Sequence, residues 1–428
     1  MSGLVTPATV GPATSRKIEL ADIVRFCGDS LRGEPFSATQ RKALGAIVAC
    51  RTALLGGQRF ACDDCGYERF VYHSCRHRAC PKCQTQARQE WLEDRQAELL
   101  PVPYFHLVFT LPHELNPLIG WNGKNQRALL NLLFHAASRT LLEFGESRLQ
   151  GTLGITLVLH TWTQQLQPHY HVHGVVPAGA LSLKSADGPA VWQVAGRKFL
   201  FPVHALSLVF RAKYIAGLQS LLHDGELDLP PHLAASLSVP QGIDDWVRRH
   251  LLRQRWVVYS QAPFGGPAKV LEYLSRYTHR TAISNERILW LRDGQVCFQW
   301  RDRRHDDELR RSVLPALEFV KRFAQHILPD GFRRIRHYGL LSNRDKTERL
   351  NLCRRLLGVV APPPEAAEPK QTALQWLESV SGLNAAVCPC CHAPLEVTTL
   401  PRLLRSRQLS DGLSVGLAAS SPQELDSS

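Results

Sequence analysis

The chain has 428 residues, of which 44% are hydrophobic and 21% are charged, as in globular proteins of two or three domains. No apolar run approaches the roughly 18 residues that a membrane span needs. Residues 1–16 also lack the basic-then-apolar order of a signal peptide. We therefore expect a cytoplasmic protein with no membrane partner.

Basic residues outnumber acidic residues by 51 to 38, which gives a net charge of +13. Only 11 of the 51 are lysines, so arginine, whose planar guanidinium suits phosphate, dominates. A surplus of this size favours a polyanionic partner, most often nucleic acid, and hence association with the nucleoid. A solvated basic surface encoded by a GC-rich genome would give the same count.

Residues 1–16 are expected to be disordered, and residues 17–100 to form a helical zinc-binding domain. Apolar residues between Ile18 and Val48 recur at the spacing of amphipathic helices. Paired cysteines follow between residues 62 and 83, and then a charged helical stretch runs to residue 100.

Two Cys-x-x-Cys pairs, separated by fourteen residues, predict one structural Zn²⁺ site. Cysteines in a cytoplasmic chain are not expected to form disulfides. Cys75 or His77, which lie between the pairs, could replace one ligand. Six candidates are too few for two tetrahedral sites, so we expect a single zinc ion. The expected ligands are Cys62, Cys65, Cys80 and Cys83.

Basic side chains around the second pair would give this domain a DNA-binding face, although a purely structural zinc is equally compatible with the pattern. They are Arg76, Arg78 and Lys82. Near the C-terminus, Cys388 and Cys391 form a single knuckle with no evident partner pair, which makes a second metal site the weaker hypothesis. The isolated Cys27, Cys50, Cys297 and Cys353 are expected to be core or incidental residues.

Strands and helices then alternate, which predicts an α+β catalytic domain over residues 101–345. Strand patterns cover residues 104–111, 155–159, 169–173, 199–201, 256–259, 287–291 and 296–300, and helical patterns cover residues 125–149 and 268–280. Residues 346–428 contain a proline-rich linker and a tail expected to be mostly disordered.

A group of histidines predicts a catalytic metal site. Alternate side chains of a strand share a face, so His171 and His173 point the same way. A hairpin through residues 164–168 would bring His160 beside them. His169 shares their face and competes with His160 as the third ligand. We favour His160, because a cross-strand residue surrounds an ion better than a third residue along one strand.

Two tyrosines supply candidate nucleophiles. Tyr273 and Tyr277 are four residues apart, so their hydroxyls lie on one helix face. Alone, such a pair is more often packed against a sheet, but Arg276 and Arg280 make this helix basic and suited to binding DNA phosphates. A metal ion that polarises a phosphodiester would allow a tyrosine to attack it and form a phosphotyrosine.

These motifs together resemble those of the insertion sequence 91 family of two-tyrosine transposases. The resemblance covers roughly residues 20–345. It is carried by the cysteine segment 74–83, the histidine segments 160–162 and 169–173, and the tyrosine segment 273–280, with residues 109–112 and 335–339 also similar.

The resemblance implies a zinc-binding domain followed by a rolling-circle nuclease domain, in which an antiparallel sheet carries the histidines and a helix carries the tyrosines. It implies cleavage of single-stranded DNA at transposon ends and targets, with a 5′-phosphotyrosine and a free 3′-hydroxyl. Mg²⁺ or Mn²⁺ is the implied catalytic ion, although three imidazoles ordinarily suit zinc or a later transition metal.

Two other functions remain compatible with the sequence. A plasmid replication initiator or relaxase-like nicking enzyme would use the same tyrosine chemistry. A zinc-containing DNA-binding regulator without catalysis would leave the histidines as packed core groups and the tyrosines inert, and the length of the chain argues against it.

Overall fold

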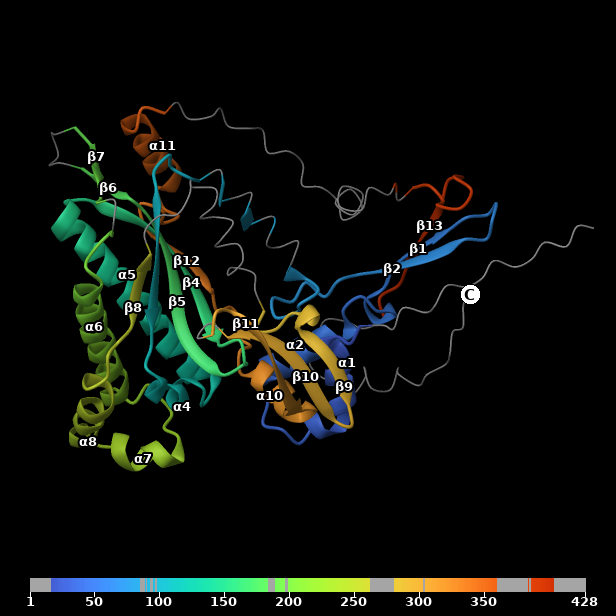
Figure 1. Ribbon diagram of the computed structural model, residues 1–428, viewed down its shortest axis with the longest axis horizontal. Coiled ribbons are helices and arrows are strands. Elements are labelled where there is room, and N and C mark those ends of the chain that lie inside the picture. The colour runs from blue at the N-terminus through green and yellow to red at the C-terminus, as the bar shows by residue number, and fades with distance from the viewer. Residues whose placement is uncertain are drawn as a thin grey trace, which may run out of the picture.

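The protein is a mixture of helices and antiparallel sheets, which confirms the expected α+β class (Figure 1). A computed structural model describes residues 17–84, 89, 91–92, 95–96, 98–183, 189–196, 199–261, 281–302, 305–359, 384 and 386–403. Among these residues no helix is long and apolar enough to cross a membrane.

The largest sheet has the strand order β7-β6-β4-β5-β3-β8, and β12 pairs with β4 beside β6. All of its pairings are antiparallel. The strands are β3 (Tyr104–Thr110), β4 (Thr152–Trp162), β5 (Pro168–Pro177), β6 (Gly179–Ser182), β7 (Val191–Val194), β8 (Val258–Gln261) and β12 (Ile335–Gly339).

Helices cover one face of this sheet, where α5 and α6 lie side by side in Figure 1. The Asn122 side chain caps α5 by accepting a hydrogen bond from the Asn125 amide, and Gln150 ends the helix in a left-handed conformation. Alternate strand residues such as Leu157 and Val172 pack against these helices in the largest core. The helices are α4 (Asn116–Ile119), α5 (Gly123–Leu149), α6 (Val203–His223), α7 (Pro231–Leu237) and α8 (Pro240–Val247).

A second core joins the N-terminal helices to a three-stranded sheet from the later part of the chain. Ser37 and Gln40 form a capping box that starts α2. Buried residues of α1 and α2 pack with Phe298 and Phe319, so the N-terminal helices share their core with residues far along the chain. The elements are α1 (Leu20–Cys27), α2 (Ala38–Ala49), β9 (Ile288–Arg292), β10 (Gln295–Asp302), β11 (Glu308–Pro315) and α10 (Ala316–Ala324).

A third, small sheet of order β13-β1-β2 combines the two ends of the chain. It consists of β1 (Gly57–Ala61), β2 (Glu68–Tyr72) and β13 (Glu396–Leu400), which extend away from the large sheet in Figure 1. Helix α11 (Lys346–Leu356) packs instead near β7, against a minor core that contains Leu100 and Trp192.

Most sequence-predicted elements within the described residues are present, but the strand expected at residues 199–201 is wrong. These residues lead into α6, because Pro202 is the N-cap of that helix, and Leu200 and Phe201 are buried without strand pairing. The helix expected at residues 268–280 lies outside the described residues.

Candidate active site and metal centres

The hairpin of β4 and β5 places three histidines on the sheet face opposite α5 and α6. His160 is directly opposite His171 in the strand register, and His173 is two residues further along β5. Val172, between the two, points into the helix-covered core. The imidazole nitrogens of His160, His171 and His173 lie within 4.8 Å of one another.

The turn of this hairpin is fixed to the second core. Leu166 is fully buried there with a positive φ of 62°, and its carbonyl accepts hydrogen bonds from Gln325 and from Nε2 of His326. Burial lowers the pKa of His326 to about 4, so its ring is neutral and its Nδ1 can accept a hydrogen bond from Thr161. Two cores therefore hold the strand that carries His160.

Hydrogen bonds at the far ring nitrogens orient two of the imidazoles. Nδ1 of His171 donates to the carbonyl of His169 at 2.9 Å, which leaves Nε2 of His171 with a lone pair. Nδ1 of His173 lies 2.9 Å from Nε2 of His106, whose pKa burial lowers to about 4. The neutral His106 can accept from His173, which leaves Nε2 of His173 with a lone pair as well.

This arrangement fits a metal ion. The Nε2 atoms of His171 and His173 are 3.2 Å apart. Two nitrogens that each lie about 2.1 Å from one ion are separated by about 3.0–3.4 Å for tetrahedral or octahedral angles. Two facing lone pairs repel each other unless a cation or a proton lies between them. The side chains are also buried, since 5%, 8% and 7% of His160, His171 and His173 are exposed.

His169, the alternative third ligand, is not part of this group. Its ring lies 5.5 Å from that of His113 and 4.7 Å from that of His171, centroid to centroid. Its backbone carbonyl, rather than its ring, contributes to the site by holding His171. The geometry therefore favours His160 over His169.

The predicted nucleophiles Tyr273 and Tyr277, together with Arg276 and Arg280, lie outside the described residues. The described residues that flank this segment, Gln261 and Thr281, are near the strands that carry the histidines. Gln261 pairs with His106 in the strand register, and Thr281 lines a small cavity with Thr161 and Trp162.

The cysteines form two groups of four sulfurs rather than the single site expected from the spacing, so that grouping is corrected. The first group joins Cys80 and Cys83 to Cys75 and Cys50, at the C-terminus of α2. Cys62 and Cys65 are not part of it. Cys50, predicted to be a core or incidental residue, was missed as a ligand because it stands alone in sequence, twenty-five residues before Cys75.

The first group has the dimensions of a zinc site. Sγ of Cys83 lies 3.5 Å from Sγ of Cys50 and 3.6 Å from Sγ of Cys75, close to the roughly 3.8 Å expected around zinc. Hydrogen bonds from the other thiols lower the pKa of Cys83 below its usual range. His77 is not a member, because its Nδ1 accepts from the amide of Ala79.

The second group joins Cys62 and Cys65 to Cys388 and Cys391. The knuckle near the C-terminus therefore has a partner pair, which its sequence neighbours could not reveal. Sγ of Cys62 lies 3.3 Å from Sγ of Cys391, and Sγ of Cys65 lies 3.5 Å from Sγ of Cys388.

Arg76, Arg78 and Lys82 were predicted to contact DNA, and the structure corrects this prediction for Arg78. Its guanidinium is half-buried and donates to the carbonyls of Leu328, Pro329 and Phe332, so it joins the cysteine segment to the loop that follows α10. Burial lowers its pKa accordingly. Arg76 is exposed, with a positive φ of 52°.

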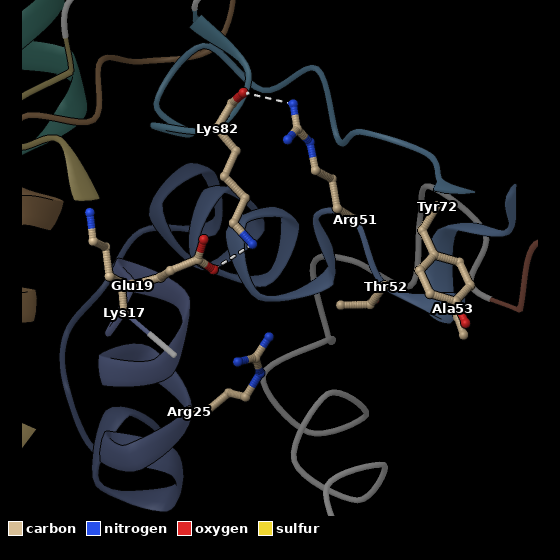
Figure 2. Close-up of a pocket in the computed structure, with 8 residues that line it drawn as sticks. All are labelled: Lys17, Glu19, Arg25, Arg51, Thr52, Ala53, Tyr72 and Lys82. Atoms are coloured by element: carbon tan, nitrogen blue, oxygen red, sulfur yellow. Dashed lines mark hydrogen bonds and ion pairs between the residues drawn. The ribbon is translucent and has the colours of Figure 1, made fainter. Parts of the chain in front are cut away.

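Lys82 lines an open pocket of about 710 Å³ beside the first cysteine group (Figure 2). Glu19 pairs with Lys82 at 2.5 Å, and Arg51 donates to the Lys82 carbonyl. Four cations face one carboxylate in this pocket, which makes it electropositive. Its lining consists of Lys17, Glu19, Arg25, Arg51, Thr52, Ala53, Tyr72 and Lys82.

Comparisons with known proteins agree with this architecture. A family model described as "Transposase zinc-binding domain" matches residues 23–111, and one described as "Putative transposase" matches residues 154–349. The chain is 41% identical over 387 residues to "Putative transposase y4qJ" of Sinorhizobium fredii (strain NBRC 101917 / NGR234), covering 89% of this chain and 94% of that protein. No solved structure matches the chain.

A second relative is "Transposase for insertion sequence element IS801" of Pseudomonas savastanoi pv. phaseolicola. It is 30% identical to this chain over 360 residues, which cover 82% of each protein. A zinc-binding domain ahead of a sheet domain with these relatives defines a transposase, which acts on DNA. The chain belongs to the insertion sequence 91 family of transposases. The zinc-binding match and the cysteine groups support structural zinc.

Proposed function

We propose that this transposase cleaves and rejoins single-stranded DNA at transposon ends and targets, by rolling-circle transposition through a 5′-phosphotyrosine. The observation that carries the proposal is the buried histidine triad, whose His171 and His173 direct Nε2 lone pairs at one point. Packing alone does not require this arrangement, in which ring nitrogens from two strands converge within ligand distance of a single ion.

His160, His171 and His173 would hold Mg²⁺ or Mn²⁺, which would polarise the scissile phosphate and stabilise its developing charge. His106 and the His169 carbonyl keep the two β5 rings in the tautomer that leaves Nε2 as the ligand atom. The burial of His160, His171 and His173 excludes water from the ligand nitrogens.

Tyr273 and Tyr277 are the proposed nucleophiles. The hydroxyl oxygen of one tyrosine attacks the phosphorus, the bond from phosphorus to the 3′-oxygen breaks, and the tyrosine proton ends on the released 3′-hydroxyl. The DNA strand stays linked to the tyrosine through its 5′-phosphate. In the chain, the segment that contains both tyrosines follows Gln261, which pairs with His106 in the strand register, and precedes Thr281, which lines a cavity with Thr161 and Trp162.

Replacing both tyrosines by phenylalanine should abolish covalent attachment to DNA. The experiment incubates the full chain with Mn²⁺ or Mg²⁺ and single-stranded oligonucleotides tiled across the DNA that flanks the gene, and detects the adduct on a denaturing gel. Each single variant should retain attachment at one cleavage step, since the other hydroxyl remains. Tyr259→Phe, at an exposed tyrosine of β8, is the matched control.

Undiminished attachment in the Tyr273→Phe, Tyr277→Phe protein would refute the tyrosine assignment. An adduct formed equally well on duplex and single-stranded oligonucleotides would refute the single-strand preference. Peptide mapping of the linked tyrosine identifies the residue directly.

We also propose that the electropositive pocket beside the first cysteine group binds DNA phosphates. Lys17 and Arg51 carry two of its four positive charges, and both are exposed. Changing both to glutamine should weaken DNA binding and reduce the slope of log affinity against log salt by about 1–2, since each phosphate contact releases about one counterion.

Fluorescence anisotropy at several salt concentrations measures this slope. Arg148→Gln, an exposed charge at the end of α5, is the control for net charge alone. If the slope of log affinity against log salt changes by the same amount per charge removed in the pocket variant and in Arg148→Gln, the pocket is not a specific contact surface.

A further inference from the structure

Two short cysteine turns, one near each terminus of the chain, face each other at one end of the small sheet. Neither matched family region, 23–111 or 154–349, includes the second turn. We propose that Cys62, Cys65, Cys388 and Cys391 bind a second zinc ion, which fastens residues 386–403 to the hairpin of β1 and β2.

The two turns have the same backbone geometry. In the first, the amide of Gly66 donates to the carbonyl of Cys62 at 3.0 Å, and Gly66 has a φ of 71°. In the second, the amide of His392 donates to the carbonyl of Cys388 at 3.0 Å, and His392 has a φ of 62°. A non-glycine residue adopts this left-handed conformation at a cost, so the turn at His392 is held by its surroundings.

The four sulfurs fit tetrahedral zinc and not a disulfide. The cross-turn Sγ–Sγ distances of 3.3 and 3.5 Å are near the roughly 3.8 Å expected for two sulfurs around zinc, whereas a disulfide requires about 2.05 Å. All four thiols are free, and their Sγ atoms lie within 4.8 Å of one another. Two paired knuckles beside an antiparallel sheet are the arrangement of structural zinc ribbons.

The backbone of β1 leaves room for the C-terminal strand. β13 pairs with β1 over five residues, from Gly57 opposite Leu400 to Ala61 opposite Glu396. Gly56 has a φ of 69°, and a Cβ there would lie only 2.7 Å from the Leu400 carbonyl oxygen. The close approach therefore depends on a glycine in the N-terminal segment.

Strand pairing alone gives β13 little stability. Residues 396–399 are exposed, so the pairing buries little apolar surface. The paired cysteines also lie 323 and 329 positions apart in the chain, so their contact closes a very long loop. A metal ion bound by both turns supplies the stabilisation that the strand lacks.

Thiol alkylation of the zinc-loaded full chain, read by peptide mass spectrometry, tests the site. Cys65 and Cys391 are exposed, as is Cys390, which is outside the group. Zinc should slow alkylation of Cys65 and Cys391 at least about tenfold relative to Cys390, because a metal-bound thiolate is not free to react. A chelator should abolish the difference. Alkylation of Cys391 as fast as Cys390 in the zinc-loaded protein would overturn the proposal.

The Cys388→Ser variant tests the coupling between the two turns. It should contain one zinc fewer than the wild type and expose Cys62 and Cys65 to alkylation, while Cys80 and Cys83 stay protected and report an intact first group. Cys390→Ser should keep the wild-type zinc content. Because both variants keep the histidines, the difference in zinc content between them does not depend on zinc bound there. Unchanged zinc content, or unchanged protection of Cys65, in the Cys388→Ser protein would overturn the proposal.

Discussion

Replacing His171 by alanine is expected to abolish metal-dependent attachment of the protein to single-stranded DNA. The change removes one of two Nε2 atoms that face each other at 3.2 Å, and with it one strand-borne metal ligand. We expect the rate of adduct formation to fall by more than about 100-fold, since even groups behind the ligands typically contribute 10–100-fold. Mn²⁺ affinity, measured by calorimetry without DNA, should fall in parallel.

The neighbouring histidines provide a graded series of controls. His160→Ala should impair Mn²⁺ binding, whereas His169→Ala should leave it nearly unchanged, because the contact to His171 comes from the His169 backbone carbonyl. His106→Leu should lower Mn²⁺ affinity by about 10–100-fold, and His106→Gln should restore part of it by keeping an acceptor for His173. Loss of binding in His169→Ala with retention in His160→Ala would reverse the assignment of the third ligand.

The histidine hairpin was predictable because all of its geometry is local. Two β-branched runs joined by a short turn specify the register, and strand alternation then puts His160, His171 and His173 on one face. His106 was missed, because it lies on β3, and only the pairing of β3 with β5 brings it to His173. Nothing in the sequence around residue 106 marks it as a neighbour of a metal site.

The cysteine groups show where local spacing fails. Two Cys-x-x-Cys pairs fourteen residues apart fit one zinc site as well as they fit halves of two sites. The choice depends on ligands that the spacing does not contain, Cys50 at the end of α2 and Cys388 in a distant segment. The prediction for Arg78 was wrong for a related reason. A basic residue is expected at the surface unless it is known that backbone carbonyls, here those of Leu328 and Pro329 after α10, lie beside it.

The second large effect is expected from Cys80→Ser, which should strongly destabilise the fold around α1 and α2. Cys80 is fully buried, belongs to the first group of four sulfurs, and packs in the core that joins the N-terminal helices to β9 and β10. Structural zinc stabilises small zinc domains by about 10–16 kcal/mol, so losing a ligand should lower the free energy of unfolding by several kcal/mol.

Cys27→Ser is the matched control, because it makes the same change of sulfur to oxygen in the same core. Cys27 is 5% exposed and outside the four-sulfur groups, and burial raises its pKa to about 11, as expected for a neutral thiol among apolar residues. Its replacement should cost only about 1–3 kcal/mol, the usual penalty for burying a hydroxyl. Urea unfolding, followed by tryptophan fluorescence with and without a chelator, separates the two effects. With the chelator present, the wild type should be no more stable than the Cys80→Ser protein, and Cys27→Ser should still lose stability on chelation. Equal losses in the two variants, both insensitive to chelation, would mean that the first cysteine group stabilises this core by packing and not by binding zinc.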